Sequence, residues 1–470
     1  MTQDSLSPSL HHKIFEEIGL VSLWQCPFDA KLLCAQRFVR LFAYGGSTLI
    51  LASYLSALGI SDDRIGLFMT LTLVGDVAIS FLLTLFADAM GRRAVLALGS
   101  VMMIGSGVVF GLLGDYWALL AAAVLGVISP SGNEIGPFKA VEESTLAHLT
   151  PKDLLRDILL WYSLIGTAGT ALGVMTCGWA MNLLQTGRGW DFIAACRTFF
   201  FAYAAIGAVK FLLSVTLSKK VEAESKKSKH KQRSETNETQ PLLGGRTAEQ
   251  QLERRSIMSF LGDKELVSLV LRLFILFGLD SFASGLASLS WMTYFFKRKF
   301  SLAEGTLGSI FFTTSIIAAI SMLLASSIAK RIGNVKTMVF THLPSALCLS
   351  LIPIPPSLSP SLTLLILRSC TQNMDVAPRS AFLAAALPSD KRTAIMGSIN
   401  VIKTSAQSLG PLITGVLAGR GVFGVSFVVA GALKVVYDLG ILGSFVGMER
   451  KRRLDEHEER EREREQGQAA

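Results

Sequence analysis

The sequence predicts an all-α membrane protein with twelve spanning helices in two six-helix bundles. Half of the 470 residues are apolar and only 17% are charged, whereas soluble proteins carry about a quarter charged residues. The apolar residues form blocks of roughly 20 to 30, long enough to cross a hydrocarbon layer of about 30 Å as helices. The two halves of the chain also repeat each other weakly, as expected after a duplication.

Six predicted spans precede a polar linker and six follow it. The spans are residues 33–58, 66–87, 94–113, 117–147, 153–183, 194–217, 264–295, 305–328, 335–354, 359–387, 393–419 and 422–448. The chain therefore divides into an N-terminal segment (1–32), a first bundle (33–217), a linker (218–263), a second bundle (264–448) and a charged tail (449–470). The linker has the composition of a disordered segment. The tail has the Glu/Arg pattern of a solvated helix.

Basic residues in short loops predict the orientation. They gather on one side of the predicted membrane, and the positive-inside rule makes that side cytoplasmic, together with both termini. Lys297–Lys299 are an exception to this pattern. The net charge of +9 is thus explained by topology, and no nucleic-acid partner is expected. The N-terminus lacks a basic start followed by an apolar run, so no cleavable signal peptide is expected. The six cysteines lack metal-ligand spacing, and no metal site is expected.

The internal repeat is visible in three places that occur in the same order in both halves. The corresponding segments are Arg40–Phe42 with Arg272–Phe274, Ala87–Gly91 with Ala329–Gly333, and Glu134–Pro137 with Asp375–Pro378. The last pair places an acid three residues before a proline in both the fourth and the tenth span.

The loop between the second and third spans carries a family signature. Residues 84–93 read T-L-F-A-D-A-M-G-R-R, which resembles the motif G-x-L-A-D-R-x-G-R-[RK] of the major facilitator superfamily. The matching positions are Ala87, Asp88, Gly91, Arg92 and Arg93, while Thr84, Phe86 and Ala89 depart from the motif. The resemblance implies a secondary transporter in which Asp88, Gly91, Arg92 and Arg93 form a cytoplasmic gate. The alternative is that these charges only fix the topology.

A second likeness lies in the eleventh span. Gly410, Pro411 and Gly415 look like the G-P-x-x-x-G kink that antiporters of the superfamily carry in the fifth span. We expect Gly410 and Pro411 to bend this helix. Because the motif stands in the other half, it is weak support for antiport, and close helix packing at the glycines is the alternative function.

Ionisable residues inside the spans are candidate functional sites, because a charge at mid-bilayer costs at least a few kcal/mol. The candidates for proton or substrate binding are Asp76, Glu134, Lys139, Asp280, Asp375, Arg379 and Lys403. Arg40 is a separate case, since its long side chain can reach the interface from the end of the first span. Glu142 is expected to be satisfied by water or by an arginine.

Glu134 and Asp375 are the leading proton sites, because they occupy equivalent positions in helices that line the central cavity of the superfamily. A carboxylate buried there can bind and release a proton as access alternates. The alternative is a buried salt bridge with a nearby cation. Asp280, in a glycine-rich and polar stretch, is a further candidate. Lys139, Arg379 and Lys403 could instead bind an anionic group of a substrate.

The linker contains a candidate sorting signal. Glu238, Leu242 and Leu243 fit the acidic dileucine pattern [DE]-x-x-x-L-[LI], which would direct the protein to a vacuolar or lysosomal membrane; an inert linker in a plasma-membrane protein is the alternative. The sequence contains no phosphate-binding loop, nucleophile elbow or metalloprotease motif, so neither an enzyme nor a cofactor is expected.

Together these features predict a secondary active transporter, proton-coupled, that moves a small solute through the bilayer as a monomer. The alternative is a nutrient receptor with a transporter fold that does not transport. The substrate and the direction of transport do not follow from the sequence.

Overall fold

The described part of the chain is helical throughout. The computed structural model describes residues 20–126, 128–131, 137–222, 264–388 and 391–469. Every regular element within these residues is a helix. Seven of the described helical segments are long and apolar enough to cross a membrane. The predicted all-α membrane class is confirmed. The count of twelve spans stays a prediction, because the other described helices are shorter or less apolar than these seven.

The helices of the first half cover the predicted spans one to six, and two short elements, α2 (Leu20–Gln25) and the 3-10 turn η2 (Lys219–Val221), lie in the predicted N-terminal segment and linker. The other elements are α3 (Phe28–Ala57), α4 (Asp62–Met90), α5 (Arg92–Leu112), α6 (Tyr116–Gly126), α7 (Pro137–Leu149), α8 (Lys152–Asn182), the π-helical turn η1 (Leu183–Gly187) and α9 (Phe192–Val215). Local chemistry sets some of these ends. Asp191, for example, begins α9 by accepting a hydrogen bond from the Ile193 N–H at 3.0 Å.

The second half repeats this order. Its helices are α12 (Lys264–Leu286), α13 (Leu289–Phe300), α14 (Glu304–Ile332), α15 (Asn334–Leu351), α16 (Leu358–Ser369), α17 (Val376–Ala386), α18 (Arg392–Gly419) and α19 (Phe423–Ala469). The last helix runs from the twelfth predicted span into the charged tail without a break, so residue 449 is not a helix boundary.

Three predicted spans are broken into two helices each. The fourth divides into α6 and α7, the seventh into α12 and α13, and the tenth into α16 and α17. Pro137 opens α7, where a missing N–H costs nothing, and the extended backbone of Ser288 (ψ 156°) separates α12 from α13. Broken helices are tolerated at membrane depth where their freed backbone groups line a polar cavity.

The internal repeat has a counterpart in the backbone. Gly91 and Gly333 have φ values of +90° and +98°, and each directly precedes a helix, α5 or α15. Residues with a Cβ rarely adopt this conformation. The two segments that were aligned by sequence, Ala87–Gly91 and Ala329–Gly333, therefore end in the same glycine-dependent turn.

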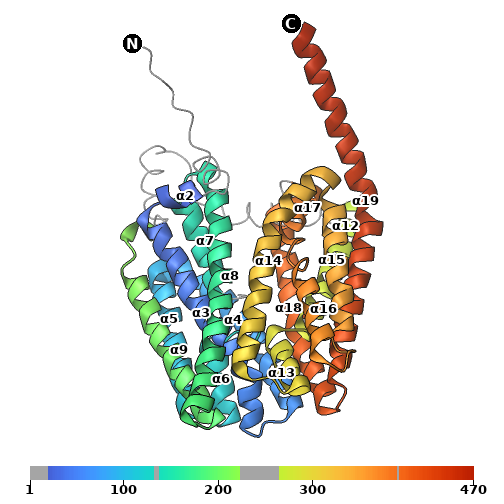
Figure 1. Ribbon diagram of the computed structural model, residues 1–470. Helices are drawn as coiled ribbons and strands as arrows, with labels where there is room; N and C mark the ends of the chain where they lie inside the picture. Colours follow the sequence, from blue (N-terminus) through green and yellow to red (C-terminus); the bar gives the residue numbers. More distant parts are fainter. Residues whose placement is uncertain (1–19, 127, 132–136, 223–263, 389–390, 470) are drawn as a thin grey trace, which may run out of the picture.

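The two halves meet at one end and separate at the other (Figure 1). The ends of α2, α7 and α17 lie at the separated end, near the side where the C-terminal end of α19 projects. At the opposite end α13 of the second half packs beside α3 of the first. There the Ser290 hydroxyl donates to the Thr48 carbonyl at 3.1 Å, and Arg298 pairs with Asp62 at 2.6 Å. We call these the open end and the closed end.

The buried apolar residues follow the same division. One cluster contains residues from both halves, including Leu49 and Phe68 from the first and Trp291 and Phe423 from the second. A second cluster belongs to the first half alone and a third to the second half alone. Among the described residues, the apolar core that the halves share is the one at the closed end.

Glycines allow the helices of the two halves to touch at the closed end. A Cβ on Gly415 of α18 would lie 2.7 Å from the Cα of Gly66 of α4. A Cβ on Gly178 of α8 would lie 2.9 Å from the Cα of Gly308 of α14. Small residues permit this close approach of backbones.

We expect Gly415→Val to separate the two halves at the closed end, because its side chain would overlap α4 at a cost of roughly 1–3 kcal/mol. The measurement is the labelling rate of a cysteine introduced at Ser290, which is buried between the halves, in a protein whose native cysteines are replaced. Gly397→Val, on the same helix with open space around it, is the matched control. Equal labelling in the two variants would contradict the tight contact.

Candidate transport cavity

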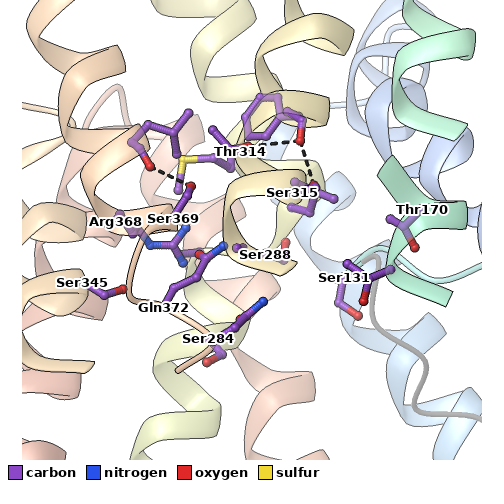
Figure 2. A pocket seen from close by; sticks show the side chains of 18 of the residues that line it. Ser131, Thr170, Ser284, Ser288, Thr314, Ser315, Ser345, Arg368, Ser369 and Gln372 are labelled. Atoms are coloured by element: carbon purple, nitrogen blue, oxygen red, sulfur yellow. Dashed lines mark hydrogen bonds between the residues drawn. The ribbon is translucent and has the colours of Figure 1, made fainter. Parts of the chain in front are cut away.

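A cavity of about 460 Å³ lies between the two halves. Figure 2 shows Ser131 and Thr170 of the first half on one wall, with Arg368, Ser369 and Gln372 of the second half across from them. All three helix breaks reach it, through Ser131, Ser288 and the pair Gln372 and Asn373. The breaks therefore position polar groups at the centre of the molecule.

The described lining of the cavity is polar and basic. Ten serines and threonines line it: Ser131, Ser163, Thr167, Thr170, Ser284, Ser288, Thr314, Ser315, Ser345 and Ser369. The charged lining residues are all basic, namely Arg37, Lys139, Arg368 and Lys434, with His342 beside them. No Asp or Glu belongs to the lining among the described residues. The cavity thus favours solutes that accept hydrogen bonds or carry negative charge.

A buried carboxylate forms the centre of an ion-pair network behind the second-half wall. Asp280 of α12 accepts a hydrogen bond from Lys434 of α19 at 2.6 Å and lies 3.4 Å from Arg379 of α17. Arg379 also pairs with Asp375, one helical turn earlier. Asp280 and Asp375 are 4% and 1% exposed, so these pairs replace water as the partner of each charge.

His342 extends this network to a third carboxylate. Its Nδ1 lies 2.9 Å and 3.0 Å from the two carboxylate oxygens of Asp438, and its Nε2 lies 3.9 Å from Asp280. The imidazole therefore stands between two acids. His342 and Lys434 also line the cavity, so two members of the network can be reached from the solute site.

The first half has a separate buried ion pair. Both terminal nitrogens of Arg40 donate to the Glu142 carboxylate at 2.7 Å, and the Tyr162 hydroxyl donates to the same group at 2.5 Å. The sequence suggested that the Arg40 side chain could reach the membrane interface. Arg40 is instead 1% exposed and buried against Glu142. The alternative in which an arginine satisfies Glu142 is the one observed.

The structure brings some predicted site residues together and leaves others apart. Asp280, Asp375 and Arg379 share one network. Lys139 lines the cavity and lies 3.8 Å from Glu143. Lys403 lies outside the cavity lining, with its Nζ 5.9 Å from the ring centre of Phe277. Asp76 is buried in α4. Glu134, Glu238, Leu242 and Leu243 lie outside the described residues, and so does the side chain of Asp88.

The remaining motif residues contact their own half or the closed end. The Glu222 carboxylate accepts hydrogen bonds from the backbone N–H groups of Arg92 at 2.7 Å and Arg93 at 3.2 Å, at the start of α5. Helix α18 continues through Pro411. Gly410 packs against the backbone of Gly285, and a Cβ there would lie 2.6 Å from its Cα.

Four residues of the second-half site were missed in the sequence. His342, Arg368, Lys434 and Asp438 all lie in predicted spans, and the rule that an intramembrane charge marks a site applies to each of them. Lys434 and Asp438 are four residues apart, as expected for charges on one helix face. A complete count of charges in the ninth, tenth and twelfth spans would have found the set.

Two helical halves around a polar central cavity, closed at one end, define the fold of a membrane transporter. The profile described as Major Facilitator Superfamily matches residues 273–468. The uncharacterized membrane protein YJR124C of Saccharomyces cerevisiae is 36% identical over 440 residues, which are 91% of this chain and 97% of that protein.

Two solved structures share the fold. The nucleoside transporter NupG superposes with a TM-score of 0.63 at 14% identity, covering 89% of this chain and 100% of NupG. A D-xylose–proton symporter superposes with a TM-score of 0.64 at 14% identity, covering 88% and 96%. The chain belongs to the same family as YJR124C, and its second half matches the major facilitator profile.

We expect Glu142→Gln to destabilise the protein by about 3–5 kcal/mol, because it leaves the Arg40 guanidinium buried without its counter-charge. Thermal unfolding in detergent measures the effect. Glu143→Gln is the matched control at the next position, where the side chain is 41% exposed and a loss of about 0.5 kcal/mol or less is expected. Similar unfolding temperatures for the two variants would mean that the buried pair contributes little.

Proposed function

We propose that the protein is a secondary active transporter that moves a small solute by alternating access, coupled to protons. The observation that carries this proposal is the overlap of two sites: His342 and Lys434 line the cavity and also belong to the buried carboxylate network. A solute in the cavity therefore touches His342, whose charge depends on protonation, and Lys434, which pairs with a carboxylate of the network. The D-xylose–proton symporter, which has the same fold, is consistent with this chemistry.

Alternating access requires the closed end to open. The contacts there are an apolar core, close glycine contacts and a few polar pairs. One of these pairs joins Arg298 to Asp62, and the Arg298 side chain is half-exposed. A half-exposed ion pair contributes about 0–1 kcal/mol. The closed end can therefore separate without breaking a strong ionic lock. Asp88, Gly91, Arg92 and Arg93 would form the cytoplasmic gate, which closes the open end in the opposite state.

Proton coupling is supported by the charge balance of the network. Three carboxylates, on Asp280, Asp375 and Asp438, contact two permanent cations, Arg379 and Lys434, together with His342. With a neutral imidazole these groups carry one net negative charge, and a proton removes it. Since net charge is costly at membrane depth, proton binding here would ease the movement of the second half. Glu134 remains a candidate in the first half.

The orientation and the membrane that we propose for the protein come from the sequence. Both termini would be cytoplasmic, which makes the open end the cytoplasmic end. Glu238, Leu242 and Leu243 would direct the protein to a vacuolar or lysosomal membrane, whereas an inert linker would leave it in the plasma membrane. The functional unit would be a monomer, because one chain contains the whole cavity.

We expect His342→Gln and Asp375→Asn to abolish solute-dependent proton movement in proteoliposomes that are screened against pools of sugars, amino acids, organic acids and nucleosides. Either change alters the number of protons that the network can bind. Exchange of labelled solute across the membrane should survive in His342→Gln, since exchange needs no net proton transfer. His148→Gln, an exposed histidine, is the control and should behave as wild type.

Other outcomes separate the alternatives. Proton coupling that survives both substitutions would move the proton site to Asp280 or Glu134. Solute movement without proton movement in the wild type would leave transport standing and remove the coupling. Binding without any solute movement would favour the receptor function.

A further inference from the structure

We propose that the cavity selects a small hydroxylated anion, a sugar phosphate or a hydroxycarboxylate, and that Arg368 binds its anionic group. The inference rests on the proposed function only in taking the central cavity as the solute site.

Arg368 differs from Arg40 of the first half and Arg379 of the second half in its partners. Arg40 and Arg379 each have a carboxylate partner. Arg368 stands in the last turn of α16 and lines the cavity, yet among the described residues its side chain makes no ion pair. Its Nε is buried without a hydrogen-bond partner, as are those of Arg40 and Arg379, so the missing counter-charge is what sets Arg368 apart. A charged group in a span without a counter-charge is costly. An anion in the cavity would supply the missing charge.

The other cations of the lining are less suited than Arg368 to bind the anionic group of a solute. Lys434 already contacts Asp280 at 2.6 Å, and Lys139 lies near Glu143 with 44% of its side chain exposed. Arg37 lies over the Tyr162 ring at 4.1 Å. Each of them adds positive potential to the cavity, which attracts an anion. Arg368 offers the planar fork that binds both oxygens of a carboxylate or phosphate.

Polar groups that suit a hydroxylated body surround this guanidinium. Ser369 follows Arg368 directly, and Gln372 lies four residues after Arg368, at the break between α16 and α17. Figure 2 shows Ser369 and Gln372 beside Arg368 on the cavity wall. The ten hydroxyl-bearing side chains of the lining can donate to and accept from solute hydroxyl groups. Phe311 is the only Phe, Tyr or Trp in the lining among the described residues. The site therefore lacks the stacked aromatic walls that a flat aromatic solute would use.

The experiment compares neutral polyols with their anionic derivatives on the full chain in detergent. The probes are glucose, gluconate and glucose 6-phosphate, and the corresponding set glycerol, glycerate and glycerol 3-phosphate. Thermal stabilisation identifies binding, and isothermal titration gives the affinity. We expect anionic members to bind and neutral members not to, and the carboxylate and phosphate arms distinguish the two anion classes.

The variants assign the anionic group to Arg368. Arg368→Gln should weaken anion binding about 10- to 100-fold, as expected for loss of a charge-assisted hydrogen-bonded pair. Arg368→Lys should recover only part of that loss, because an ammonium lacks the planar fork. Arg420→Gln, at an exposed position beyond α18, is the control and should bind as wild type. All variants are compared only after their unfolding temperatures without solute are shown to be similar.

Three results would overturn the inference: preferential binding of neutral members, no binding by any anionic member, or anion binding that Arg368→Gln leaves unchanged. Binding is measured without a membrane, so the result is independent of transport. Anion binding without flux in proteoliposomes would remove the proposed transport and keep the solute class. Flux of neutral solutes alone would keep the proposed transport and remove the anionic solute class.

Discussion

The structure depends on one constraint: a charge inside the bilayer must find its counter-charge within the protein. Asp280, Lys434 and Arg379 satisfy this constraint together, and they connect α12, α17 and α19. The Arg40 and Glu142 pair does the same between α3 and α7. These pairs join helices that are distant in sequence, so each half is organised around its own buried charges as well as its apolar core. Arg368, which lines the cavity, has no such partner among the described residues, and the proposed anionic solute would supply one.

The apolar packing divides the described part of the molecule into two halves. One core joins the halves at the closed end, and separate cores hold each half together at the open end. Because each half has an apolar cluster of its own, the proposed change of contact between the halves would leave both clusters in place. The helix breaks contribute in another way, since they expose backbone and side-chain polar groups to the cavity where continuous helices would present only side chains.

Much of the fold could be predicted from the sequence. Hydrophobic length placed the helices, and the repeat of Gly91 and Gly333 was visible as a sequence alignment before it appeared as a shared backbone turn. The breaks in the fourth, seventh and tenth spans were not predicted, because apolar residues continue on both sides of them and hydropathy does not register a local change of φ and ψ. The membrane class was confirmed, while the proton sites and the gate remain proposals.

The site was predicted less completely, for physical reasons that differ between residues. Asp280, Asp375 and Arg379 were found because each is a charge in an apolar block. Their partners on α15 and α19 come from distant segments, and sequence spacing carries no information on which distant helices pack together. Arg40 illustrates the same limit: the sequence located the charge, but only the packing of α3 against α7 and α8 revealed that Glu142 and Tyr162 surround it.

The apolar character of the closed end has a consequence for how the two states respond to their surroundings. Burial of apolar surface carries a large negative heat-capacity change and little dependence on ionic strength. The equilibrium between closed and separated ends should therefore shift with temperature far more than with salt. Trp291, Phe295 and their apolar neighbours would then make cooling, which weakens apolar burial, favour separation of this end.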